Sequence, residues 1–378
     1  MNPQKIWLSA PHMGGSEMKY IQEALDSNWV APAGPNLDLF EEKIEDYLGQ
    51  GHVAVLNSGT AAIHLGLLLL GVQAGDEVLC QSMTFSASAN PILYLGATPV
   101  FVDSETKTWN LCPIALEEAI ADRIAKGKRP KAIIAVHLYG VPYKIMSIRA
   151  VADKYGIPIL EDSAEAMGSR YKGQMCGTFG DIGILSFNGS KIITTSGGGA
   201  IITPTKALKE KAVFLATQSK DPAPHYQHSE IGYNYRMSSV CAGIGRGQME
   251  VLEEHLVLRR AMHAFYVDLF KDIVGVTVFT VTEEGAVANY WLSTILIQSE
   301  VTGGITREHL RRAFEAAHIE SRPLWKPMHL QPVFECYPYY GGTVAESLFE
   351  TGLCLPSGSN LSEEDRARIA AVVKGVFQ

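Results

Sequence analysis

The sequence predicts an α/β fold with a mostly parallel central sheet flanked by helices, followed by a smaller α+β C-terminal domain. Between about residues 53 and 203, short apolar runs alternate with segments of helix length. These runs are apolar on both faces, which is typical of strands in a parallel sheet that helices cover on each side. After about residue 248, a long helical pattern leads into a shorter set of strands and helices. The length of 378 residues also fits about two domains.

The predicted elements of the first part alternate regularly. Apolar runs predict strands over residues 53–56, 77–80, 98–102, 132–136, 157–160 and 182–187. Helices are predicted over residues 61–70, 87–95 and 145–154. Ligands of such sheets bind outside the carboxyl ends of the strands. The residues that follow each strand are therefore the first candidates for a functional site.

The second part begins with a single helix, predicted over residues 248–270 from apolar side chains at helical spacing. Further elements are expected over residues 276–279, 291–297 and 307–317. We predict a large domain over residues 1–248, with an N-terminal arm over about residues 1–35. A small domain would follow over residues 249–378, entered through the long helix.

Composition excludes several classes of protein. A net charge of -8 gives no broad basic field, so a nucleic-acid partner is not expected. The six cysteines show no CxxC spacing, which favours reduced thiols in a cytoplasmic protein without a metal site or disulfide framework. No secretory signal is visible at the start of the chain, and no apolar stretch approaches the roughly 18 residues of a membrane span.

The segment Asn57-Ser-Gly-Thr-Ala-Ala-Ile-His64 follows a predicted strand and opens a helix. A turn of small residues leaves backbone N–H groups free at the helix N-terminus, where they and the helix dipole favour a phosphate. Gly59 and Thr60 are the candidates. The same residues, Ser58 to Thr60, fit an ordinary N-cap equally well.

The segment Leu160-Glu-Asp-Ser-Ala-Glu165 also lies at a strand end. A carboxylate there can pair with a protonated pyridine nitrogen and keep the ring an electron sink. Asp162 is the candidate, with a helix cap as the alternative. Glu165 is either a capping-box acid or a contact to the oxygen of the same ring.

Lys191 follows a predicted strand and precedes the glycines Gly197-Gly-Gly199. An amine in this setting can bind an aldehyde covalently once it is deprotonated. Ser186 can donate its hydroxyl to a phosphate, and the glycines let the chain bend close to the site. Phe85, which follows another strand, can stack on a pyridine face. Taken singly, Lys191 is better explained as a surface lysine and Phe85 as a core aromatic.

The segment from His225 to Ser238 is rich in donors and aromatic residues where a loop is expected. Asn234 and Arg236 in this segment suit anion binding. Either side chain could instead hold the loop in place.

Taken together, a phosphate turn, a stacking aromatic, a strand-end aspartate, a serine and a lysine are what a pyridoxal phosphate transferase of the aspartate aminotransferase fold (fold type I) needs. Over essentially its whole length the chain resembles the DegT/DnrJ/StrS sugar aminotransferases. The motifs that carry the resemblance are Asn28-Trp-Val-Ala31, Asn57-Ser-Gly-Thr-Ala-Ala62, Thr84-Phe85, His137-Leu-Tyr-Gly140, Glu161-Asp-Ser-Ala-Glu165, Gly180-Asp181, Ser186 with Lys191, and Gly232-Tyr-Asn-Tyr-Arg-Met237.

The resemblance implies a role for each matching residue. Lys191 would bind pyridoxal 5'-phosphate covalently, Asp162 would pair with the ring nitrogen, Glu165 would contact the ring oxygen and Phe85 would stack on the ring. Gly59, Thr60 and Ser186 would hold the phosphate, joined by Asn234 from the neighbouring subunit of a homodimer. The substrate-binding residues would be Asn28, Trp29, Val30, Ala31, Arg236, Trp325, Lys326 and His329.

The resemblance also implies the reaction, which is transfer of an amino group from L-glutamate to a nucleotide-linked keto sugar. Glu165 stands where many members carry glutamine, and Ser196-Gly-Gly-Gly199 lacks a glutamate often found there. These departures resemble the subgroup that aminates C4 of UDP-4-keto-6-deoxy-N-acetylglucosamine in bacillosamine-type pathways, as do the segments at residues 11–15, 191–195 and 355–358. Alternatives are a dTDP-linked 3- or 4-keto-6-deoxy sugar and a non-catalytic regulator on the same scaffold. A sugar dehydratase would carry histidine in place of Lys191.

Overall fold

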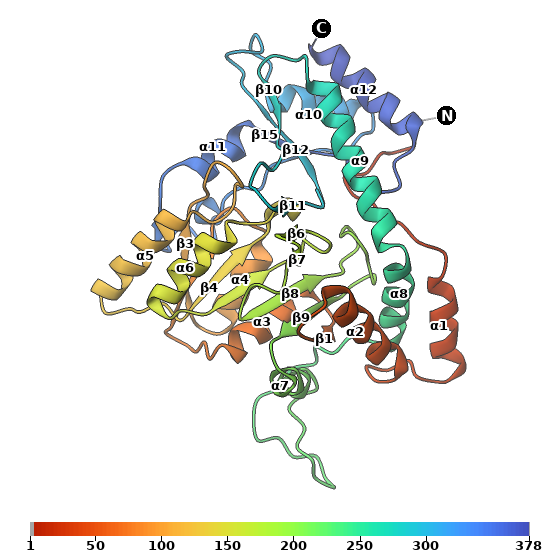
Figure 1. Cartoon of the computed structure of the whole chain (residues 1–378), viewed down its shortest axis with the longest axis vertical. Coiled ribbons are helices and arrows are strands. Elements are labelled where there is room, and N and C mark those ends of the chain that lie inside the picture. Colours follow the sequence, from red (N-terminus) through yellow and green to blue (C-terminus); the bar gives the residue numbers. More distant parts are fainter. Residues whose placement is uncertain (1–3, 378) are drawn as a thin grey trace.

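The centre of the protein is an eight-stranded mixed sheet (Figure 1) in the computed structural model, which describes residues 4–377. Its strands follow the order β1 (His52–Leu56), β9 (Gly199–Thr203), β8 (Ile182–Ser186), β5 (Ile159–Asp162), β4 (Ala132–Val136), β2 (Glu77–Gln81), β3 (Thr98–Val102) and β14 (Tyr339–Tyr340). Among these strands only β9 runs antiparallel to its neighbours, β1 and β8. The predicted fold is confirmed, and the carboxyl ends of β1, β2, β5 and β8 meet at one edge.

Helices cover both faces of this sheet, as the doubly apolar strands require. On one face α3 (Gly59–Leu69), α4 (Ser86–Tyr94) and α7 (Lys206–Ala216) pack with Val78 and Cys80 of β2. On the other face α5 (Pro113–Ala125) and α6 (Ile145–Tyr155) pack with Leu79 of the same strand. Helices α5 and α7 were not predicted from the sequence.

Within the described residues the expected N-terminal arm contains one complete helix, α1, and ends where α2 begins, while residues 1–3 lie outside the described residues. Helices α1 (Glu17–Asp26) and α2 (Pro35–Leu48) both pack against α8 (Ser239–Glu250). Before them, Ile6 forms a parallel bridge with Ile319. The start of the chain therefore lies beside its C-terminal third.

The single helix predicted over residues 248–270 is wrong at its start. Residues 248–250 end α8, and a separate helix, α9 (Leu252–Phe270), begins after Val251. Val251 has φ -112° and ψ 5°, which lies outside the helical region and breaks the helix between the two segments. Figure 1 shows α9 running from α8 toward the C-terminal elements.

The C-terminal part contains an antiparallel four-stranded sheet, as expected of an α+β unit. Its strands are β10 (Val276–Val278), β12 (Ser293–Ile297), β15 (Gly352–Leu355) and β13 (Arg322–Pro323), in that order. Its helices are α10 (Arg307–Ala316), α11 (Val344–Thr351) and α12 (Glu363–Phe377). Because β14 from this part joins the central sheet, the domain boundary at residue 248 stays a prediction.

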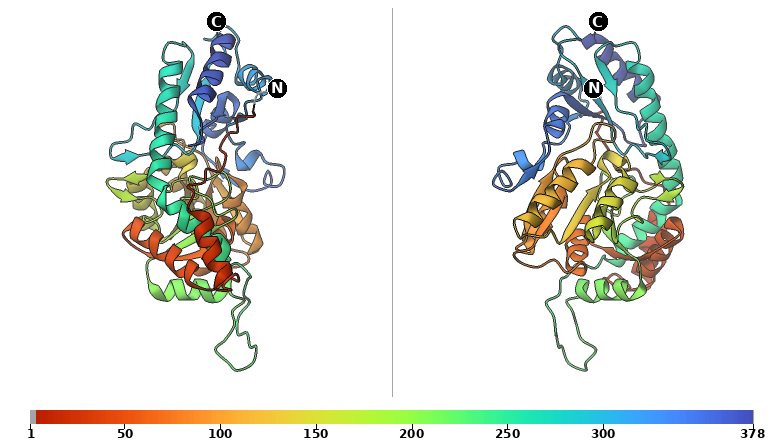
Figure 2. Two further views of the ribbon diagram at one scale, coloured as in Figure 1. Left: turned by 90° about the vertical axis from the view of Figure 1, so that its right-hand side faces the viewer. Right: turned by 60° about the vertical axis from the view of Figure 1, so that its left-hand side comes forward.

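Three small features complete the fold. Strands β11 (Ala286–Val287), β6 (Arg170–Tyr171) and β7 (Gln174–Met175) form a separate sheet, and short 3₁₀ helices lie at Leu138–Gly140 and Met328–Leu330. The segment after α7 projects away from the body of the molecule in each view of Figure 2. Within residues 4–377, no helix combines the length and apolar character needed to cross a membrane.

Candidate active site

A cavity of about 410 Å³ opens at the carboxyl-end edge of the sheet, where the strand pattern predicts a ligand site. Eight of the predicted site residues line it: Gly59, Thr60, Phe85, Asp162, Glu165, Ser186, Lys191 and Trp325. Distant segments complete the wall, namely Leu8 and Ser9, Trp291 and Leu292, Glu320 and Arg322, and Cys354. Residues from both halves of the sequence therefore surround one space.

The turn after β1 both caps helix α3 and forms part of the cavity wall. The Ser58 hydroxyl accepts a hydrogen bond from the Ala61 N–H at 3.0 Å, so the N-cap interpretation holds for Ser58. Gly59 and Thr60 form the first turn of α3 and face the cavity with Ser186. The turn lies close to β8, because a Cβ atom on Gly59 would stand 3.1 Å from Cβ of Ser186.

Asp162 ends β5 and is 3% exposed. One of its carboxylate oxygens accepts a hydrogen bond from the Ser88 hydroxyl at 2.6 Å, and the other accepts one from the Ala164 N–H at 3.1 Å. These donors hold the carboxylate at the cavity wall. It is therefore placed to attract a protonated nitrogen.

The neighbouring Glu161 points away from this site and is completely buried. Its oxygens accept hydrogen bonds from the imidazole of His137 at 2.7 Å and from the backbone N–H groups of Gly177, Phe179 and Gly180. Burial acts to raise the pKa of Glu161, but these donors outweigh it and lower the pKa. Although Cys176 lies within 4.8 Å of His137 and Glu161, this saturated carboxylate favours a structural role for the cluster.

The Lys191 amine lies between an acid and an aromatic face. Its Nζ atom is 3.4 Å from Oε1 of Glu165 and 3.9 Å from the ring centroid of Trp291. The other oxygen of Glu165 accepts a hydrogen bond from the Tyr139 N–H at 2.7 Å. Tyr139 has a left-handed backbone with φ 54°, a conformation that costs an L-residue about 1–2 kcal/mol. The N–H that Tyr139 directs at Glu165 gives this strained conformation a functional explanation.

Phe85 is 57% exposed although it lines the cavity, so it is not the core aromatic that its residue type would favour. Its ring lies 5.5 Å from that of Trp325, between centroids. An exposed ring at the mouth of a cavity leaves its face available to a flat ligand.

A sequence model of the DegT/DnrJ/EryC1/StrS aminotransferase family matches residues 11–374. The chain belongs to this family. It is 48% identical over 378 residues to EpsN of Bacillus subtilis (strain 168), which is assigned as a pyridoxal phosphate-dependent aminotransferase, with 99% of this chain and 96% of the relative covered. GDP-perosamine synthase of Escherichia coli O157:H7 is 37% identical, with 94% of this chain and 93% of the relative covered. The structure of Spr1654 from Streptococcus pneumoniae, assigned as a sugar aminotransferase and solved in its PLP form, has a TM-score of 0.88 at 25% identity, with 100% of both chains covered.

The protein is thus a pyridoxal phosphate-dependent aminotransferase, and the predicted family and cofactor are confirmed. The cavity fits this cofactor by its own chemistry. It combines a helix N-terminus and a serine hydroxyl for a phosphate, a buried carboxylate for a ring nitrogen, and one lysine amine for an aldehyde.

Glu165 gives the aminotransferase a pH-dependent stability. Burial raises the pKa of Glu165 from 4.5 to about 7, although Lys191 and the Tyr139 N–H act to lower it. Between these pH values the unfolded chain releases a proton that the folded chain keeps, so folding weakens as pH rises. We expect the free energy of unfolding of the cofactor-free protein to fall, relative to that of Glu165→Gln, by up to about 3 kcal/mol across this window.

Chemical denaturation of both proteins at several pH values checks this expectation. Below pH 4.5 and above pH 7 the difference between wild type and Glu165→Gln should be level. A difference that stays constant through the window would contradict the raised pKa.

Gly199 couples strand β9 to the phosphate turn. It lies between Leu56 and Ser186 in the sheet, and a Cβ atom there would stand 2.4 Å from the Gly59 nitrogen. We expect Gly199→Ala to displace the turn and weaken cofactor retention by about tenfold, since overpacking costs on the order of 1–3 kcal/mol. The cofactor content remaining after dialysis measures this loss.

Gly189→Ala is the matched control in the same part of the chain. An added Cβ there would meet nothing closer than Pro11 at 3.9 Å. Equal cofactor retention in the two variants would show that the approach of β9 to the turn is unimportant.

Several residues predicted to bind substrate, and Asn234 predicted to bind the cofactor, do not line the cavity of this chain. Asn28, Trp29, Val30 and Ala31 are exposed, and Trp29 borders a separate surface hollow beside Pro35. Asn234 is exposed, and Lys326 is half-buried outside the cavity. Their roles stay predictions that depend on a second subunit or on the substrate itself.

Arg236 and His329 have partners that favour structural roles. The Arg236 guanidinium pairs with Glu41 and donates to the Val55 carbonyl at 2.9 Å. The two ring nitrogens of His329 lie 2.7 Å from the Ser82 hydroxyl and 3.1 Å from the Glu346 carboxylate. Neither side chain lines the cavity of this chain, and their substrate-binding roles stay predictions.

The sequence predicted no individual role for Ser88, Tyr139, Trp291 or Glu320. Ser88 is one helical turn after Phe85 and a signal for it existed, because α4 begins at a candidate strand end. Tyr139 also follows a predicted strand, β4, and lies in one of the family motifs, whereas Trp291 and Glu320 lie in the C-terminal part, where nothing in the local sequence indicates a cavity.

Proposed function

We propose that this aminotransferase transfers an amino group from L-glutamate to the C4 ketone of UDP-4-keto-6-deoxy-N-acetylglucosamine. The observation that carries the transamination chemistry is the convergence of Lys191, Asp162, Ser186 and the turn at Gly59 and Thr60 on one cavity. The motifs shared with C4 aminotransferases support the choice of sugar.

The proposed mechanism has two half-reactions at this one site. Bound pyridoxal phosphate supplies an electron sink that stabilises negative charge on the reacting carbon. Asp162 would keep a proton on the ring nitrogen, and Gly59, Thr60 and Ser186 would hold the phosphate. Glu165 would contact the ring oxygen and Phe85 the ring face. Lys191, once its amine is free, would move a proton between the substrate carbon and the cofactor carbon.

The nucleotide is the least constrained part of the proposal. A GDP-perosamine synthase is among the relatives, and its name indicates a GDP-linked sugar. The alternative substrates are the dTDP-linked 3- or 4-keto-6-deoxy sugar predicted from the sequence and, because of this relative, a GDP-linked keto sugar. A non-catalytic regulator is disfavoured by the complete set of cavity residues, and a dehydratase is disfavoured by Lys191.

The decisive experiment loads the protein with pyridoxamine 5'-phosphate and presents UDP-, dTDP- and GDP-linked keto sugars. NMR of the product identifies the amino position and its stereochemistry. We expect a 4-amino product from the UDP sugar. A 3-amino product, or turnover of the dTDP or GDP sugar alone, would replace the proposed substrate, and inactivity with every sugar and with L-glutamate would favour a regulator.

We also propose a homodimer in which Asn234 completes the phosphate site of the partner. Asn234 is exposed and lies between α7 and α8, where it forms an antiparallel bridge with Thr217. Its backbone carbonyl accepts a hydrogen bond from the Asn57 side chain at 3.1 Å, so the segment is tied to the turn after β1. Sedimentation of wild type and cofactor retention in Asn234→Ala test the two parts separately.

A further inference from the structure

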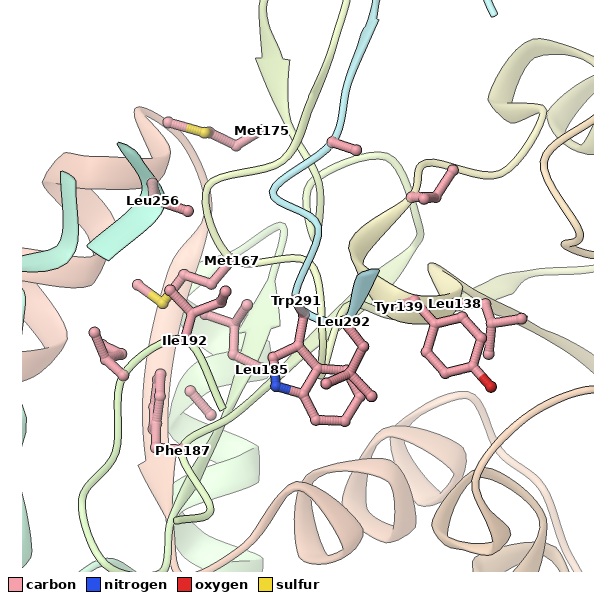
Figure 3. Close-up of a cluster of buried hydrophobic side chains, with 14 of the residues drawn as sticks. Leu138, Tyr139, Met167, Met175, Leu185, Phe187, Ile192, Leu256, Trp291 and Leu292 are labelled. Carbon is pink, nitrogen blue, oxygen red and sulfur yellow. The ribbon is translucent and has the colours of Figure 1, made fainter. Parts of the chain in front are cut away.

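Trp291 is the aromatic residue nearest to the reactive amine. The Lys191 Nζ atom stands 3.9 Å above the centroid of its ring, and the indole N–H donates to the Ser190 carbonyl at 2.6 Å. Trp291 is only 5% exposed. In Figure 3 it lies between Leu185 and Ile192 on one side and Tyr139 on the other, carried on a C-terminal segment that reaches into the large domain's core.

The backbone of Trp291 is fixed from two directions. Its N–H donates to the Asn289 side chain at 2.8 Å, and its carbonyl accepts from the Arg259 guanidinium at 2.7 Å. The same guanidinium donates to the Lys191 carbonyl at 3.4 Å. Arg259 is 1% exposed and forms no ion pair within residues 4–377, so its donors serve backbone carbonyls and the Ser9 hydroxyl. Trp291 and Lys191 are therefore held by one buried residue.

Few charged groups surround the Lys191 amine, and the Trp291 ring is its other close contact. Glu165 lies 3.4 Å from Nζ, and Asp162 shares the cavity wall. The only other charged residues among the described lining residues are Glu320 and Arg322, which pair with each other at 2.8 Å. A desolvated aromatic face attracts an ammonium group, and Lys has a long flexible stem that otherwise samples many positions.

We propose that Trp291 is a further catalytic residue, whose ring face receives the Lys191 amine whenever that amine is not bound to the cofactor. This inference rests on the proposed transamination, in which the amine is released and rebound in each half-reaction. A fixed resting position would keep Nζ within reach of the reacting carbons. Holding reacting groups close together in this way accelerates a reaction. Arg259 is a positioning residue that acts through Trp291 and the Lys191 backbone.

The test measures the Lys191 amine itself in protein loaded with pyridoxamine 5'-phosphate, where this amine is free. Its acylation rate is followed by mass spectrometry at about pH 7 and about pH 11, on the two sides of the ordinary range of a lysine amine. In Trp291→Leu we expect the amine to lose its charge more easily. The rate at about pH 7 should therefore rise, and the ratio of the rate at about pH 11 to the rate at about pH 7 should fall by about tenfold. Trp291→Phe keeps an aromatic face and should stay within about threefold of wild type.

Trp7→Leu is the matched control. Trp7 is 51% exposed and contacts the Lys5 amine at 3.8 Å outside the cavity, so its loss should leave the Lys191 ratio unchanged. A change of access alone would raise both rates equally and leave the ratio at its wild-type value. That result, or equal ratios in the Phe and Leu variants, would overturn the proposal.

If Trp291→Leu does not fold, Trp291→Met serves in its place, because it also removes the ring and fills much of the volume. The proposed function fails separately, when wild type with pyridoxal phosphate shows no absorbance of lysine-bound cofactor. If the rate ratio falls in Trp291→Leu while wild type is inactive in transamination, the contact between Trp291 and Lys191 is supported and only the proposed reaction is contradicted.

Discussion

Lys191→Ala is expected to purify without the absorbance of lysine-bound pyridoxal phosphate and to lose transamination by more than about 10³-fold. The reason is that this one side chain both binds the aldehyde and moves the proton. Lys191 is the only lysine among the described residues that line the cavity, so no neighbour can replace its amine. Absorbance spectra and the L-glutamate half-reaction measure the two losses.

Two further variants show which property of Lys191 matters. Lys191→Arg keeps a cation beside Glu165 and Trp291 but cannot form the covalent bond, so it should be as inactive as the alanine variant. Lys144→Ala removes a lysine that pairs with Glu105 at 2.7 Å outside the cavity, and should keep its absorbance. Unchanged absorbance and activity in Lys191→Ala would refute the proposed function.

The central sheet was predictable because each strand is apolar on both faces and short. Strands β3 and β4 occupy the residues that the pattern indicates, β1, β2 and β8 differ from it by one residue at one end, and β5 is shifted by two residues. Strands β9 and β14 of this sheet were not predicted, and the direction of β9 could not have been, because an apolar run reads the same in either orientation. The break at Val251 was also hidden, since the apolar stripe continues through it.

The site divides in the same way. Residues at strand ends, such as Asp162 and Ser186, were predictable because parallel strands bring their carboxyl ends together. Trp291 and Glu320 were not, because they reach the cavity only through the packing of the C-terminal part against the large sheet. Arg236 shows a different limit: its residue type suits either anion binding or holding a loop, and its pairing with Glu41 could not be read from the sequence.

Asp162→Asn is expected to lower transamination by about 10²–10³-fold while the cofactor stays bound to Lys191. The amide is nearly the same shape as the carboxylate, so the contacts with Ser88 and Ala164 can largely persist. What the variant loses is the negative charge that holds a proton on the ring nitrogen. The loss should therefore fall on the proton-transfer step and spare covalent binding, which separates it from the Lys191 variants.

The L-glutamate half-reaction and the absorbance spectrum distinguish these outcomes, and two variants provide the scale. Ser88→Ala keeps the charge and removes one donor, so it should cost no more than about tenfold. Asp181→Asn changes a carboxylate at the opposite end of the same sheet, where it accepts from the Ile159 N–H, and should leave the half-reaction unchanged. If Asp162→Asn reacted as fast as Asp181→Asn, the charge of Asp162 would have no catalytic role, and its burial beside Ser88 would have to be explained by folding alone.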